Sequence, residues 1–260
     1  MGEPSEPREP GVPPAPPGLV VLYADADLIA LDKPAGRHTA PLRPGETGTM
    51  LGEAIGRFPE IAGLSGIKSV EPGLLHRLDR DTSGVVVVAR NAAAFQNLRA
   101  QFRAGRVRKE YLALCVPQAG SAPVWPVQAG QRFVLESRFA PYGPGRRKVR
   151  VVPAGADGGA GREASPGTYR TEAEVLEARG PRVLVRAVIV RGFRHQVRAH
   201  LAHLGLPIAG DPLYGVPVPP GTRGRLYLHA SAVELRHPDG GRPLCIRSPL
   251  PPDFGPCYKE

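Results

Sequence analysis

The chain has 260 residues, of which 42% are hydrophobic, and it carries a formal net charge of +10 with a sequence pI of about 10.0. This composition excludes a largely disordered chain, and the lack of an apolar run of about 18 residues excludes a membrane-spanning helix. Three widely spaced cysteines, Cys115, Cys245 and Cys257, fit neither a disulfide framework nor a metal cluster. The N-terminus lacks the basic start and apolar core of a secretory signal, so we expect a cytoplasmic protein.

The excess of basic residues, most of them arginine, suits a polyanionic partner. Each contact between a basic side chain and a phosphate releases condensed counterions and adds affinity, which favours a nucleic acid as the partner. A GC-rich coding sequence would also enrich arginine together with glycine, alanine and proline. The charge alone therefore leaves both explanations open.

The chain begins with a segment rich in proline, residues 1–17, which we expect to be an extended or disordered tail. Two short apolar runs at 19–23 and 28–31 flank an Asp-Ala-Asp turn and predict strands. The apolar spacing over 49–58, with Pro59 directly after it, predicts a helix.

The rest of the chain mixes strands and helices without a regular alternation. A β-branched run predicts a buried strand at 84–89, and Asn91 is placed to cap a helix that ends near Gly105. The remaining patterns predict strands at 109–116, 171–176, 183–190 and 226–235, hairpins and loops over 120–167, and a helix at 193–204. We therefore expect an α+β fold rather than a doubly wound sheet.

The segment at 76–84, HRLDRDTSG, carries the most distinctive chemistry. It places the carboxylate of Asp79 between Arg77 and Arg80, in a loop whose glycine lets the backbone approach a ligand closely. With a reference pKa of about 3.9, an aspartate is ionised at neutral pH and can act as a nucleophile or base. On the residues alone, a loop salt bridge is the more common reason for such a pattern.

The wording of this segment resembles the signature loop of the RluA-type pseudouridine synthases, in which HRLD is followed by two variable residues and TSG. Three other segments resemble motifs of the same family, in the same order, and the resemblance extends from residue 19 to about 250. These segments are the LDKPAG run at 31–36, the Lys-x-Tyr strand at 109–111, and GFRHQVRAHL at 192–201 with the turn at 210–215.

The resemblance implies one catalytic domain over 18–255, with a central mixed, mostly antiparallel sheet flanked by helices. It implies an isomerase, free of cofactor and metal, that converts specific uridines in ribosomal or transfer RNA to pseudouridine. Asp79 matches the family's catalytic nucleophile, and Tyr111 matches the tyrosine that stacks on the uracil and assists proton removal. Arg198 matches the arginine that pairs with the catalytic aspartate.

The resemblance also implies which residues contact RNA. Arg77 matches the arginine that helps to extrude the target nucleotide, and His76, Lys33 and Arg194 lie in the matching motifs. The basic cluster at 146–150 adds Arg147 and Lys148 as expected phosphate contacts, although a solvated hairpin tip explains that cluster equally well.

Two departures from the family pattern stand out. The third motif usually reads Gly-Arg-Thr/Ser-His-Gln, whereas this chain has Phe193 and Arg194 at the second and third positions. Only the proline-rich tail precedes the first expected strand, which leaves no room for the S4-type RNA-binding domain of many relatives. We therefore expect the catalytic domain to bind RNA by itself, as a monomer.

Three other interpretations were weighed. His195, His200 and His203 share one predicted helix, but no cysteine or carboxylate at a familiar spacing completes a zinc site. Asp79 and Asp81 lie too close in one loop to suggest a glycosidase pair, and Asp81 is expected to be a structural turn residue. The principal alternative is a catalytically inactive RNA-binding protein of the same fold.

Overall fold

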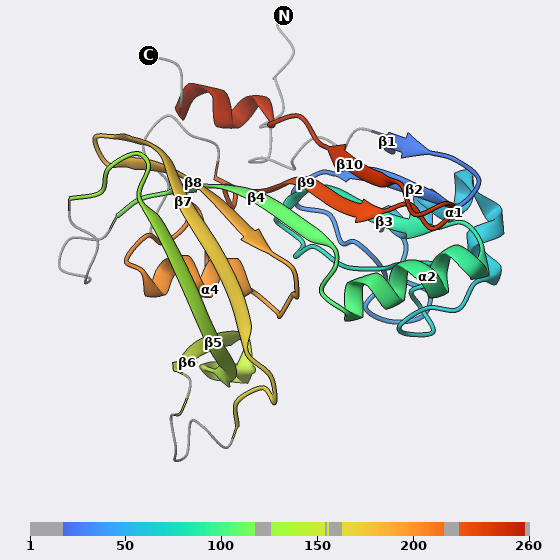
Figure 1. Cartoon of the computed structure of the whole chain (residues 1–260), viewed down its shortest axis with the longest axis horizontal. Helices are drawn as coiled ribbons and strands as arrows, with labels where there is room; N and C mark the ends of the chain where they lie inside the picture. The colour runs from blue at the N-terminus through green and yellow to red at the C-terminus, as the bar shows by residue number, and fades with distance from the viewer. Residues whose placement is uncertain (1–17, 118–125, 154, 156–162, 216–223, 258–260) are drawn as a thin grey trace, which may run out of the picture.

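Ten strands form one sheet in the order β1-β2-β3-β9-β4-β8-β7-β5-β6, with β10 paired to β9 (Figure 1). The computed structural model describes residues 18–117, 126–153, 155, 163–215 and 224–257, so the expected tail at 1–17 lies outside the described residues. The strands are β1 (Val20–Ala24), β2 (Leu28–Lys33), β3 (Ser83–Ala89), β4 (Arg108–Cys115), β5 (Arg132–Tyr142), β6 (Lys148–Pro153), β7 (Tyr169–Arg179), β8 (Arg182–Ile189), β9 (Leu228–Arg236) and β10 (Pro243–Arg247).

The sheet is mixed but almost entirely antiparallel. The exception is the pairing of β3 with β9, which runs parallel at Ser83–His229 and Gly84–Ala230. Gly84 has a φ of +115°, and a Cβ at this position would overlap the carbonyl of Ala230, so only glycine allows the two strands to approach. These features confirm the predicted α+β class with a mixed, mostly antiparallel sheet.

Both faces of β3 are buried, as its β-branched sequence predicts. On one face, Val85 and Val87 belong to a cluster that includes Phe95 of α2 (Ala92–Arg103). On the other face, Val86 belongs to the cluster that includes Met50 of α1 (Met50–Arg57). Figure 1 shows α2 beside this half of the sheet.

Side-chain caps define where these two helices begin. Thr49 accepts a hydrogen bond from the amide of Gly52 at the start of α1. Asn91 accepts one from the amide of Ala94 at the start of α2, which confirms the predicted cap. Short 3-10 helices lie at Pro59–Gly63, Pro144–Arg146 and Pro252–Cys257.

The predicted helix at 193–204 begins later than its sequence pattern suggests. The helix α4 covers Gln196–His203, because His195 adopts a left-handed conformation with φ 56°. The amide of Phe193 donates to the side chain of Gln196 and closes the preceding turn. The prediction that Arg194 lies on this helix one turn before Arg198 is therefore wrong.

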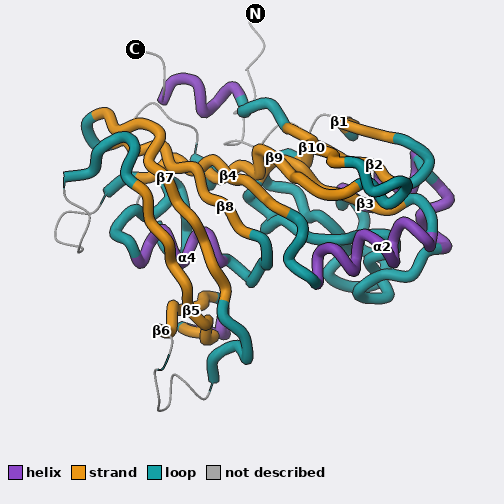
Figure 2. Tube along the Cα trace, in the orientation of Figure 1, coloured by secondary structure: helices purple, strands orange, loops and turns teal. Residues whose placement is uncertain are grey.

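Two arrangements position the site. Residues 64–82 form a long loop between the 3-10 helix at 59–63 and β3, and this loop carries Asp79 (Figure 2). The helix α4 contacts β6 and β7 in the other half of the sheet from α2. No helix among the described residues is long and apolar enough to cross a bilayer.

Candidate active site

A cleft of about 1170 Å³ brings together the residues expected to be catalytic. Asp79 reaches it from the loop before β3, Tyr111 from β4 and Arg198 from α4. The sequence places Asp79 and Arg198 119 positions apart, so the sheet and α4 must both be formed before the two side chains can meet.

Asp79 is paired with Arg198 and still accessible to a ligand. Nη1 of Arg198 lies 2.7 Å from Oδ2 of Asp79. The Asp79 side chain is 30% exposed, while that of Arg198 is 6% exposed. A charge-assisted bond from a buried guanidinium is short and directional, so it fixes the orientation of the carboxylate. The pairing of these two residues agrees with the expectation from the sequence.

A second carboxylate, that of Asp211, binds the opposite side of the Arg198 guanidinium; only its place in the Gly-Asp-Pro turn marked this residue in the sequence. Asp211 accepts from both Nε and Nη2 of Arg198 at 2.7 Å. It also accepts from the amides of Leu213 and Tyr214. Burial alone would raise the pKa of Asp211, but these bonds outweigh it and lower the pKa, so Asp211 stays ionised.

His195 also lies close to the Asp79 carboxylate. Its Nε2 lies 3.8 Å from Oδ2 of Asp79, and its Nδ1 lies 3.1 Å from the hydroxyl of Tyr214. That hydroxyl accepts from the amide of Val149, so its proton is free to be donated to Nδ1. Burial lowers the pKa of His195 despite the nearby charge of Asp79, so the ring is neutral with its Nε2 proton facing Asp79.

Tyr111 is almost completely buried on β4 at the floor of the cleft. Burial, and after it the charge of Asp79, raises the pKa of the phenol above its ordinary value of 10.0. The side chain is therefore a neutral phenol. A ligand in the cleft can contact the aromatic ring of Tyr111 and its hydroxyl.

Lys33 does not face the cleft. Its residue surface is 0% exposed, and its amine donates to the carbonyls of Pro34, Arg37 and Arg80. This burial is at odds with the expected RNA contact, because no atom of Lys33 reaches solvent. Lys33 instead fixes the carbonyl of Arg80, the residue after Asp79, and Thr39 fixes the backbone of Leu78, the residue before it.

Arg77 and His76 line the cleft, as an RNA-contacting role requires. Arg77 is 35% exposed and its Nη1 rests 2.7 Å from the buried carboxylate of Glu71. His76 stacks on Phe102 with 5.2 Å between ring centroids, and its Nε2 accepts from the amide of Val87. Burial lowers the pKa of His76 to about 3, so the ring is neutral and carries its proton on Nδ1.

The departure at Phe193 and Arg194 has a structural explanation. Phe193 stacks on Phe139 with 5.1 Å between centroids and an interplanar angle of 8°. Arg194 donates to the carbonyls of Arg146 and Lys148, at 2.8 and 3.2 Å, and so ties the turn before α4 to the β5–β6 hairpin. Arg147, at the tip of that hairpin, lines the cleft together with Arg194, while Lys148 follows it at the start of β6.

The histidines weighed as metal ligands do not converge in the described structure. His200 has hydrogen bonds at both ring nitrogens, to Thr171 and to Ser137. His195 bonds to Tyr214, as above, and His203 is exposed at the end of α4. Packing and hydrogen bonding account for the His200 side chain.

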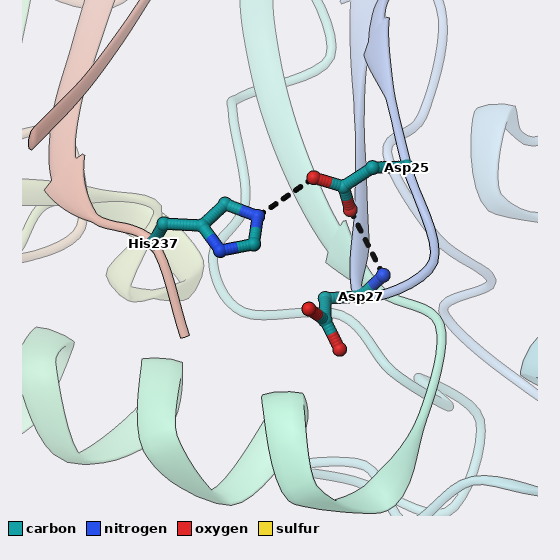
Figure 3. A group of neighbouring side chains, drawn as sticks. All are labelled: Asp25, Asp27 and His237. Carbon is teal, nitrogen blue, oxygen red and sulfur yellow. Dashed lines mark hydrogen bonds and ion pairs between the residues drawn. The ribbon is translucent and has the colours of Figure 1, made fainter. Parts of the chain in front are cut away.

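A different group, Asp25, Asp27 and His237, has the donor types of a cation site (Figure 3). The Asp25 carboxylate already accepts four hydrogen bonds, from Asp27 N, Leu28 N, the Tyr23 hydroxyl and His237 Nε2. The Asp27 carboxylate points toward α2, where it accepts from Asn91. The cluster therefore connects the turn between β1 and β2 to the turn between β9 and β10.

Comparison with known families gives matches along most of the chain. The family model described as RNA pseudouridylate synthase matches residues 27–203. An uncharacterized RNA pseudouridine synthase of Chloroflexus aurantiacus is 36% identical over 86% of the chain. The ribosomal large subunit pseudouridine synthase D of Pseudomonas aeruginosa is 32% identical over 91% of it. The chain spans 63% of the Chloroflexus protein and 69% of the Pseudomonas protein.

Solved structures agree on the fold. The human RNA pseudouridylate synthase domain containing 4 superposes with a TM-score of 0.65 over 91% of this chain and 90% of that one, at 22% identity. The human RNA pseudouridylate synthase domain containing 1 also gives 0.65, over 92% and 87%, at 24% identity.

Proposed function

Since the chain belongs to the RNA pseudouridylate synthase family, we propose that it isomerises specific uridines in structured RNA to pseudouridine, with Asp79 as the nucleophile. This membership confirms the resemblance indicated by the four motifs. The observation that carries the assignment of Asp79 is its position in the cleft, partly exposed and bonded to a buried arginine that is itself held by Asp211.

The first step is the transfer of the target nucleotide out of its stack. Unstacking costs a few kcal/mol, which contacts with the protein must offset. Arg77 is the residue we assign to this task, because it is partly exposed at the cleft and long enough to occupy the space that the base leaves. Glu71 holds the guanidinium ready at 2.7 Å.

The second step is the attack of Asp79 on the flipped nucleotide and the cleavage of the bond between N1 of uracil and C1′ of ribose. The base then turns in the cleft, carbon 5 bonds to C1′ in place of N1, and the bond to Asp79 breaks, which frees the carboxylate for the next turnover. Carbon 5 loses one proton and N1 gains one, so the reaction is balanced without a cofactor or an external reagent. Arg198, held by Asp211, serves to direct the Asp79 carboxylate toward the bound nucleotide.

Tyr111 is the residue we assign to the base and to its proton. Its ring can provide a surface for the uracil, and its hydroxyl can take part in removing the proton of carbon 5, because Tyr111 lines the cleft together with Asp79. The charge of Asp79 is one of the two causes that raise the pKa of Tyr111. Formation of a covalent bond to Asp79 removes that charge and so lowers the pKa of the phenol. The tyrosinate, which is the form that can accept the proton of carbon 5, therefore forms more easily after the attack than before it.

Ribosomal RNA of the large subunit is the first substrate class to test, because relatives in Pseudomonas aeruginosa and Nitrosomonas europaea are named for that subunit. Pseudouridine mapping by carbodiimide labelling of ribosomal and transfer RNA, from cells lacking this protein, would identify the site. Complementation with the wild type must restore the missing pseudouridine, and Asp79→Asn must not. Persistence of every site in the deleted strain would refute the proposed activity.

The alternative is an inactive RNA-binding protein of the same fold. Such a protein needs neither Asp79 nor Tyr111 for its function. It would also have no functional need for the bonds that link Asp79 to Arg198 and Arg198 to Asp211. A binder of this kind would restore its phenotype equally well with Asp79→Asn. The same complementation therefore separates the two functions.

A further inference from the structure

Lys109 is a buried cation in the cleft that the proposed chemistry does not use. It lies two residues before Tyr111 on β4 and lines the same cleft, yet it is only 6% exposed. Its amine has no hydrogen-bond acceptor in the part of the chain that the structure describes. Its recorded neighbour is the ring of Phe102, with 5.5 Å from Nζ to the centroid.

The surroundings of Lys109 leave its charge uncompensated. Burial lowers the pKa of Lys109 to about 8, and no carboxylate counteracts the shift. Glu71, the buried acid of this cleft, is bonded to Arg77, and Asp79 is bonded to Arg198. The amine thus lies at the cleft surface without a carboxylate partner, and a purely structural role would favour an apolar residue at so buried a position.

The cleft beside Lys109 contains a second hydrogen-bond donor, the Nδ1–H of His76. His76 accepts a bond at Nε2, so its Nδ1 carries a proton, for which the described residues provide no acceptor. Gly192 also borders the cleft, and a Cβ at that position would lie 3.4 Å from the Lys109 amine. Arg99 and Arg103 of α2 line the same cleft and increase its positive charge.

We propose that Lys109 and the Nδ1–H of His76 form an anion-binding subsite that holds one backbone phosphate of the RNA next to the target uridine. A neutral carbonyl of the base would leave the full charge of the ammonium uncompensated, whereas a phosphate oxygen neutralises it. The subsite rests on the proposed function only in taking RNA as the ligand. It would fix the register of the strand so that the base above Tyr111 is the one that reaches Asp79.

The test compares Lys109→Met with Arg108→Met. Both variants remove one positive charge from β4, but Arg108 pairs with Glu234 and Glu110 outside the cleft lining. Affinity for a fluorescein-labelled oligouridine is measured by anisotropy at several salt concentrations, and pseudouridine formation is measured separately on cellular RNA. Thermal melting of each variant is followed by circular dichroism.

For Lys109→Met we expect about tenfold weaker binding at low salt, and a slope of log K against log salt that is smaller by about 0.7, the value for one phosphate on a single strand. Its melting temperature should equal or exceed that of the wild type, because methionine replaces a mostly buried lysine that has no carboxylate partner. Arg108→Met should keep the wild-type slope. Lys109→Gln must also lower the slope, which keeps the proposal testable if the methionine variant fails to fold.

An unchanged slope for the Lys109 variants, or an equal change for Arg108→Met, would overturn the subsite. Loss of pseudouridine formation with normal affinity and slope would also overturn it, because Lys109 would then act on the chemistry. If the wild type forms no pseudouridine but the Lys109 slope still falls, the proposed activity fails and the subsite stands.

Discussion

Asp211 holds Arg198 at two points, with 2.7 Å from Nε to Oδ2 and 2.7 Å from Nη2 to Oδ1. This arrangement leaves Nη1 as the nitrogen that bonds to Asp79. The planar fork of an arginine can satisfy two carboxylates in fixed directions, which the single ammonium of a lysine cannot do. Asp211 therefore sets the direction of the proposed nucleophile, Asp79, through Arg198.

Asp211→Asn should reduce turnover more than RNA binding. The substitution keeps one oxygen for Arg198 and removes the charge, so the guanidinium can rotate away from Asp79. We expect kcat to fall on the order of 100-fold, and the free energy of unfolding to fall by about 3 kcal/mol because a buried ion pair is broken. Quenched time-course assays measure kcat, RNA titration measures binding, and urea unfolding measures the free energy of unfolding. The control Asp239→Asn, at an exposed position, should change none of them; full turnover in Asp211→Asn would show that Arg198 needs no second carboxylate.

Lys33→Met should act through the Asp79 loop and not through RNA. Three backbone carbonyls, those of Pro34, Arg37 and Arg80, lose their shared donor, which we expect to destabilise the fold by about 3 kcal/mol. Release of the Arg80 carbonyl should also lower turnover, since Arg80 is the residue that follows Asp79. The salt dependence of RNA binding should match that of the wild type. A smaller salt slope would restore the RNA contact first expected for Lys33.

Phe193→Ala should lower stability with little effect on RNA affinity. The ring is half-buried between Phe139 and Tyr169, at centroid distances of 5.1 and 4.9 Å. Its truncation should cost about 2 kcal/mol, less than the roughly 3–5 kcal/mol for a fully buried aromatic residue, because the ring is partly exposed. Phe193→Leu keeps much of the volume and should recover at least half of the loss in urea unfolding. Equal stability of Phe193→Ala and the wild type would contradict the packing role.

The pair of Asp25 and His237 should make stability depend on pH. Burial alone would lower the pKa of His237, but the bond to Asp25 outweighs it and raises the pKa. This contribution is fully present below the unfolded value of about 6.5 and is lost as the pH rises through the higher folded value. Hydrogen bonds, led by that of Tyr23, lower the pKa of Asp25 despite its burial, so its contribution is lost in acid instead.

Because the pKa of His237 is raised and that of Asp25 is lowered, the pair stabilises the fold only in the pH range in which both groups are charged. The difference in unfolding free energy between the wild type and His237→Gln should be largest at about pH 5 to 6, and it should shrink by about pH 9. Urea unfolding at these pH values measures the difference. A difference that does not change with pH would show that His237 acts only by packing.

Local patterns in the sequence predicted most of the fold. The run at 84–89, the cap at Asn91 and the apolar spacing over 49–58 each depend on neighbouring residues, and each element forms where expected. The strand β10 was missed because Pro243 and the prolines after it resemble a loop, and only pairing with β9 makes this segment a strand. The start of α4 was misplaced because His195 takes a left-handed conformation that side-chain periodicity does not reveal.

The site could be predicted only where a motif named it. Asp79, Tyr111 and Arg198 were identified from their motifs and they do lie in one cleft. The bonds of Asp211, the burial of Lys33 and the unpaired amine of Lys109 depend on contacts between distant segments, so composition and spacing carry no signal for them.

The most direct test of the central claim is tritium release from RNA labelled at carbon 5 of uridine, incubated with the purified protein. Isomerisation replaces the bond from carbon 5 to hydrogen with a bond to ribose, so each turnover releases one tritium to water. Wild-type protein should release tritium, Asp79→Asn should release none above background, and Asp81→Asn, two residues along the same loop, should retain most of the activity. Tritium release by Asp79→Asn at the wild-type rate would contradict the assignment of Asp79 as the nucleophile.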